Sequence, residues 1–119
     1  MKLQPLLCAA LSIAALVGCA TTSPVPSSVP SGREVVAYVT TNWGYYDARF
    51  AFLSERRDQS VALVSVTDVE CEADGGNASC NFIAQGRFGD GIILRRSMES
   101  RFQRQADGSI EMLIPVASR

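Results

Sequence analysis

The sequence predicts an α+β fold, with one N-terminal helix packed on a four-stranded antiparallel meander. Between residues 33 and 57, apolar side chains recur at steps of three and four, which is the spacing of one helix face. From Ser60 onward, apolar and polar residues alternate, as they do in strands with one buried face. Glycine-containing turns divide this second segment into four runs, so residues 33–119 are predicted to form one small domain.

The predicted helix has a start signal and a consistent apolar face. Ser31 is placed to cap it, and Glu34 follows three residues later, which is a capping-box pattern. The predicted core face consists of Val35, Val39, Trp43, Tyr46, Phe50 and Leu53. Two alternatives stay open: the β-branched residues in 35–41 could form a strand, and Gly44 could break the helix.

The four strands are predicted at residues 61–71, 80–88, 92–104 and 110–116. Three turns separate them: a Gly75-Gly76 loop, Gly89-Asp90-Gly91, and Asp107-Gly108. A helix followed by four strands resembles cystatin-like and other small α+β folds, at the level of architecture only.

The turns also predict the pairing registers. Placing Cys71 opposite Cys80 pairs Val69 with Phe82, Thr67 with Ala84, and Leu63 with Phe88. A three-residue turn at 89–91 pairs Phe88 with Ile92, Gly86 with Leu94, and Phe82 with Met98. A three-residue loop at 107–109 pairs Phe102 with Ile114 and Arg104 with Met112. One sheet face is then largely apolar and the other carries Glu99 and the arginines 87, 95 and 101.

The first strand is predicted to be apolar on both faces. In the register above, its outward residues include Ala62, Val64 and Val66, although an edge strand normally carries charge or proline there. We therefore expect these three residues to form an interface with a second copy or a partner strand. The alternative is that the N-terminal segment of the domain folds over them.

The two cysteines of the domain, Cys71 and Cys80, are predicted to form a structural disulfide. They are farther apart in the sequence than the cysteine pairs of redox or zinc motifs. Closing a loop of about ten residues stabilises a fold by ~2.5–3 kcal/mol in the chain-entropy model.

The N-terminus predicts export. Met1-Lys2 supplies a positive charge, and residues 3–17 form an apolar run shorter than the ~20 residues that span a bilayer. The run ends in Leu16-Val17-Gly18-Cys19, which resembles the lipobox of bacterial lipoproteins. The resemblance implies that residues 1–18 are a signal peptide, removed before Cys19, and that Cys19 carries lipid. The alternative is an ordinary signal peptide cut near Ala20.

A Ser-, Thr- and Pro-rich linker follows the lipid site and completes the segment 19–32. Ala20, and not aspartate, comes after the cysteine, and by family analogy this favours the outer membrane with the domain facing the periplasm.

The composition excludes several chemistries. The chain has no histidine, and Lys2 is its one lysine, so Ser–His, Cys–His and Ser–Lys nucleophile pairs are excluded from the mature domain. We predict no catalytic residue, cofactor or metal site, and the carboxylates are expected to be solvated. The slightly negative net charge argues against nucleic-acid binding.

These features predict an envelope lipoprotein that acts as a non-catalytic binding or interaction module. Its expected partners are the membrane, through the lipid, and an envelope protein or a second copy of the chain. The alternative is an envelope enzyme, or an enzyme inhibitor, that uses carboxylate or loop residues.

Overall fold

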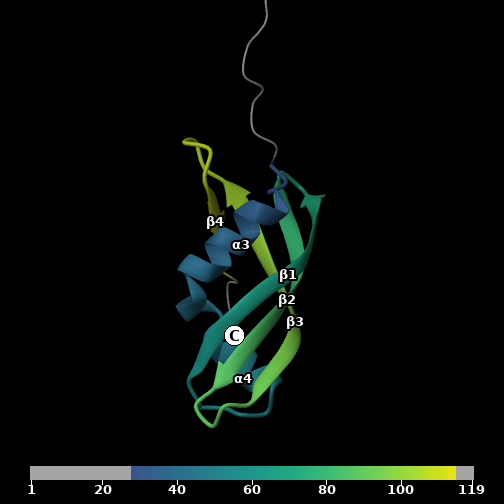
Figure 1. Cartoon of the computed structure of the whole chain (residues 1–119). Coiled ribbons are helices and arrows are strands. Elements are labelled where there is room, and N and C mark those ends of the chain that lie inside the picture. Colours follow the sequence, from purple (N-terminus) through teal and green to yellow (C-terminus); the bar gives the residue numbers. More distant parts are fainter. Residues whose placement is uncertain (1–27, 115–119) are drawn as a thin grey trace, which may run out of the picture.

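The computed structural model describes residues 28–114 (Figure 1). In this part of the chain the helices α3 (Gly32–Thr41), η3 (Trp43–Tyr45) and α4 (Asp47–Leu53) are followed by the strands β1 (Val61–Asp74), β2 (Asn77–Phe88), β3 (Ile93–Arg104) and β4 (Ile110–Met112). The strands form one antiparallel sheet in the order β1-β2-β3-β4. The α+β class and the meander are therefore confirmed, whereas the predicted signal peptide, Cys19 and residues 115–119 lie outside the described residues.

The helical segment consists of two α-helices and not one. The capping box is present: the Glu34 amide donates to Ser31 Oγ over 3.1 Å, and the Ser31 amide donates to Glu34 Oε1 over 2.9 Å. Residues 35–41 are helical, so the strand alternative is wrong. The first helix ends at Asn42, whose side chain donates to the Tyr38 carbonyl, and a 3₁₀ turn through Gly44 leads into α4.

The 3₁₀ turn changes which side chains of α4 face the core. Val35 and Val39 from α3, Tyr46, and Phe50 and Ala51 from α4 are buried. Leu53, which uninterrupted helical spacing places on that face, is 37% exposed. The predicted core face is therefore right up to Phe50 and wrong at Leu53.

The register between β2 and β3 is the predicted one, with Gly86 opposite Leu94 and Phe82 opposite Met98. The register between β3 and β4 differs from the prediction by two residues. Phe102 lies opposite Met112, because the connecting loop has five residues and closes through the Gln105 amide on the Ser109 carbonyl. An even shift keeps each side chain on its predicted face.

Strand β1 contains two irregularities that the alternation did not predict. Cys71 lies opposite Cys80 as predicted, but the register shifts between Leu63 and Ser65 and again between Thr67 and Glu70. Val66 therefore pairs with Ala84, and the predicted pairs Thr67–Ala84 and Leu63–Phe88 are wrong, while Val69 and Phe82 lie within the second register shift. The shifts have a physical benefit, since they direct Val66 into the core in place of Ser65 and Thr67.

Both helices pack on one face of the sheet, α3 toward the end with β4 and α4 toward the β2–β3 turn (Figure 1). The core beneath them is aromatic, and its fully buried phenylalanines are Phe50, Phe82, Phe88 and Phe102.

At Gly86 the sheet lies close beneath Phe50 of α4. A Cβ added there would lie 2.5 Å from Val61 Cγ2 and 2.8 Å from Phe50 Cε1. We expect Gly86→Ala to lower the free energy of unfolding by about 1–3 kcal/mol, because the added methyl overpacks the core. Denaturant titration followed by circular dichroism measures the change.

Gly89→Ala is the matched control, because a Cβ at that glycine of the same strand-to-turn region meets nothing within 4 Å. Equal stabilities for the two variants would contradict the close packing at Gly86.

Candidate functional site

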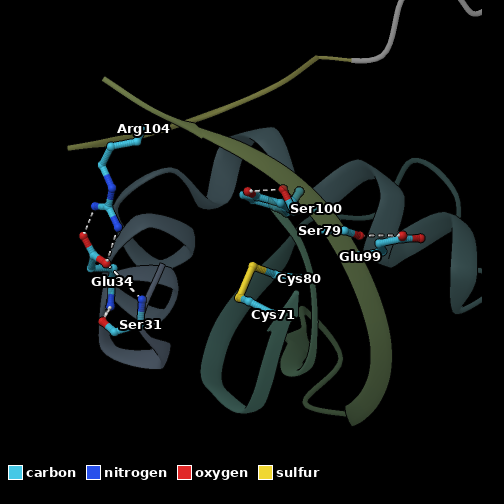
Figure 2. Close-up of a disulfide and its surroundings, with 9 residues drawn as sticks. Ser31, Glu34, Cys71, Ser79, Cys80, Glu99, Ser100 and Arg104 are labelled. Carbon is cyan, nitrogen blue, oxygen red and sulfur yellow. Dashed lines mark hydrogen bonds and ion pairs between the residues drawn. A yellow bond between two sulfur atoms is a disulfide. The ribbon is translucent and has the colours of Figure 1, made fainter. Parts of the chain in front are cut away.

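The best-defined covalent feature of the domain is the disulfide between Cys71 and Cys80 (Figure 2). The two residues are direct partners on β1 and β2, and their Cα atoms are 4.0 Å apart. Cys80 is fully buried, and Cys71 packs at the margin of the same core. The predicted pairing is confirmed, and with both sulfurs bonded to each other neither is a free thiol in this state.

The three residues predicted as an interface do not share one face. Ala62 and Val64 are exposed, Val64 by 44%, whereas Val66 is only 8% exposed and belongs to the core. The cause is the register shift next to Val64, which places Val64 and Ser65 in succession outside the core and turns Val66 inward. The predicted outward stripe of three residues is therefore reduced to Ala62 and Val64.

An ion pair joins the start of α3 to the end of β3 (Figure 2). Arg104 donates from Nη2 to Glu34 Oε1 over 3.2 Å and from Nη1 to the second carboxylate oxygen. The hydrogen bond from Arg104 lowers the pKa of Glu34 below its ordinary value, against the opposing effect of partial burial. The pair fixes the helix start to the sheet, and the sequence did not predict it because the partners are 70 residues apart.

A second missed contact lies inside the core. Tyr46 Oη and Ser100 Oγ share a hydrogen bond of 3.0 Å, and both side chains are buried. Burial raises the pKa of Tyr46 to about 12, while the hydrogen bond shared with Ser100 acts in the opposite direction. The phenol is therefore a neutral structural group at ordinary pH. Ser100 lies on the same inward face of β3 as Met98. This alternation is the sequence feature that could have predicted the burial of Ser100.

Asp68, Asp74 and Asp90 lie at the surface and have arginine partners. Asp74 contacts Arg101 over 3.1 Å and Asp68 contacts Arg95 over 4.0 Å, both across the open face of the sheet. Asp90 contacts Arg56 over 3.0 Å, and this hydrogen bond lowers its pKa.

Arg96 lies on the same inner face of β3 as Met98. It donates from Nε to Ser54 Oγ over 3.1 Å and from Nη1 to the Arg95 carbonyl over 2.8 Å. The Arg96 guanidinium therefore lies beside the backbone of β3 at Arg95.

A hollow at the surface beside α4 is lined by Phe52, Leu53, Glu55 and Arg57. Between residues 28 and 114, no three side chains of the metal-binding types are grouped so as to hold a metal ion. No helix in that range is long and apolar enough to cross a bilayer.

Comparison with known proteins gives no relative: no family model, curated protein or solved structure matches this chain.

Proposed function

We propose that this protein is a membrane-anchored lipoprotein of the bacterial envelope and that its domain is a non-catalytic interaction module. The single observation that carries the proposal is the Leu16-Val17-Gly18-Cys19 junction, which follows an apolar run and precedes a Ser-, Thr- and Pro-rich linker. Such a linker is extended, at ~3.1 Å per residue where proline dominates, and would hold the domain clear of the lipid surface.

The Cys71–Cys80 disulfide supports an address outside the cytoplasm. Disulfides persist in oxidising compartments such as the periplasm and are rare in the bacterial cytosol. Ala20 after the lipid site supports the outer membrane over the inner one. We further propose that the arrangement of helices on one face of the meander is cystatin-like in architecture.

Several ionisable side chains form hydrogen bonds and ion pairs within the fold, and this supports a binding role over catalysis. A general acid or base needs a pKa matched to its working pH. The Glu34 and Asp90 carboxyls instead have pKa values lowered by arginine partners, and that of Asp107 is lowered by hydrogen bonds from Ser109. Glu34 and Asp90 act as fixed charges that connect distant segments of the fold, and Asp107 stabilises its own turn.

Replacing Cys19 by serine tests the anchor. We expect the wild-type chain to partition into the detergent phase and to carry the mass of attached acyl chains on Cys19, because several buried acyl chains hold a protein at a membrane. Cys19→Ser should move the protein to the aqueous phase and abolish the added mass.

Cys8→Ser is the control, because Cys8 lies inside the apolar run that the signal peptidase removes. It should leave both the partitioning and the intact mass of the mature protein unchanged. A wild-type protein without lipid, cut at a site other than Gly18-Cys19, would refute the assignment.

A further inference from the structure

The outward side of α4 carries large apolar side chains at the surface. Phe50 and Ala51 turn toward the sheet and are buried, so the opposite side of the helix points away from the domain. On that side Phe52 is 54% exposed and Leu53 is 37% exposed. Neighbouring apolar side chains at a surface, unlike single ones, are a feature of interaction sites.

This side of α4 has a ridge between two hollows. The ridge is a stacked pair, in which the Arg57 guanidinium lies over the Phe52 ring, 4.8 Å from its centroid. The hollow that includes Leu53 and Glu55 is lined by this pair, and so is a second hollow, which includes Asp47. A ridge beside a hollow is a self-complementary shape, because the ridge of one copy fits the hollow of another.

Charges without a partner lie on both sides of Phe52 along the chain. Arg49 precedes it by three residues and shares its exposed helix face. Glu55 follows it by three residues, in the turn after the helix, and is also exposed. Within residues 28–114, neither Arg49 nor Glu55 has an ion-pair partner. They are ~9 Å apart along the helix direction, so they do not meet within one chain.

We propose that α4 packs antiparallel on α4 of a second copy of this chain, about a two-fold axis beside Phe52. Such an axis sets each residue before Phe52 opposite the residue that lies equally far after it in the other copy. Arg49 of each copy then faces Glu55 of the other, and Asp47 faces Arg57. Four opposite-charge pairs therefore flank two phenylalanine rings in contact, and a second copy is the occupant that this pattern fits.

Neighbouring registers place like charges opposite each other. An axis at Arg49 sets Arg49 against itself, and an axis at Glu55 sets Glu55 against itself. An axis at Leu53 sets Arg49 against Arg57. Because facing like charges cost free energy and select against the wrong alignment, pairing about Phe52 is favoured over each of these registers.

The backbone at Glu55 supports a role for its side chain outside the fold. The Arg56 amide donates to the Ala51 carbonyl over 2.9 Å, and the Glu55 amide donates to the Phe52 carbonyl over 3.0 Å. These two bonds form a Schellman motif, in which Glu55 has a left-handed backbone with φ of 59°. Glycine adopts this conformation more easily, so glutamate makes the monomer less stable than glycine would. Pairing with Arg49 of a second copy gives the carboxylate a benefit that the monomer lacks.

The contact area is small, so the dimer is expected to be weak. A helix of seven residues and the turn after it bury less than the ~800 Å² per partner of a standard interface. We expect a dissociation constant of about 10–100 μM. Unfolding measured well below that concentration therefore describes the monomer.

Charge reversal with rescue tests the register, by sedimentation equilibrium of the detergent-solubilised full chain. Arg49→Glu and Glu55→Arg should each weaken the dimer at least about tenfold, because each brings like charges together. The double variant should restore it, since opposite charges face each other again. Arg87→Glu is the matched control: Arg87 is exposed on the sheet face opposite the helices, and its reversal should leave the dimer unchanged.

Glu55→Gly separates dimer formation from folding. It should weaken the dimer at least severalfold, because the carboxylate is lost. It should not lower the melting temperature of the monomer, because glycine suits the left-handed backbone at this position. A Glu55→Gly chain that dimerises as well as the wild type would contradict the pairing of Glu55 with Arg49.

Three further outcomes would overturn the proposal. They are a wild-type chain that stays monomeric at about 1 mM, a double variant weaker than both single ones, and a dimer that forms only after removal of residues 115–119. In the last case the chain's own end would cover α4.

The inference rests on the proposed interaction role, but its failure is distinguishable from failure of the anchor. A monomeric chain with lipid on Cys19 would overturn the dimer alone, and an unlipidated chain that dimerises would overturn the anchor alone.

Discussion

Replacing Phe50 by alanine is expected to lower the free energy of unfolding by about 3–5 kcal/mol, the largest effect of the substitutions considered. The ring is fully buried and lies directly over Gly86 of the sheet. Its centroid is 5.7 Å from that of Trp43 and 5.9 Å from that of Phe88. Because the backbone at Gly86 has no side chain to fill the space, truncation leaves a cavity that cannot readily collapse.

Phe52→Ala is the matched control for this prediction. Phe52 is the same residue type in the same helix, two positions on, but it is 54% exposed. Its substitution should change stability by no more than about 0.5 kcal/mol. Denaturant titration by circular dichroism compares the two variants, and similar losses for both would show that α4 does not pack through Phe50.

The elements that the sequence predicted well are those decided by local chemistry. Ser31 and Glu34 are near enough along the chain to define a cap without tertiary information. The turn at Gly89, Asp90 and Gly91 likewise sets the β2–β3 register, because a short loop leaves little freedom for slippage.

The features that the sequence did not predict depend on contacts between distant segments. Alternation cannot reveal that β1 has two extra residues, since the benefit, burial of Val66, exists only once α3 covers the sheet. The fourth strand, expected at 110–116, is shorter in the described part of the chain, where β4 is Ile110–Met112, and residues 115–116 lie outside that part.

The same distinction applies to the candidate sites. The disulfide could be predicted because Cys71 and Cys80 flank one hairpin. The Glu34–Arg104 and Tyr46–Ser100 contacts join residues that are 70 and 54 positions apart, and several equivalent partners existed for each in the sequence.

Removing the Cys71–Cys80 disulfide, by the double substitution Cys71→Ala with Cys80→Ala, is expected to cost about 2.5–3 kcal/mol of stability. The bond closes a loop across the β1–β2 hairpin and so restricts the unfolded chain. For a domain of this size the loss corresponds to a melting temperature lower by about 10–20 °C. Thermal unfolding of the wild type and the double variant, both without reductant, measures the difference.

The reduced wild type provides the control that separates the bond from the side chains. Reductant should lower the melting temperature of the wild type toward that of the double variant and should leave the variant unchanged. Cys80 is fully buried beside the core, so two alanines also remove some packing, and the variant should melt slightly below the reduced wild type. If reductant leaves the wild type unaffected while alkylation shows both thiols free, the bond contributes nothing to stability. The β1–β2 register would then be maintained by the core contacts of Val66 and its neighbours alone.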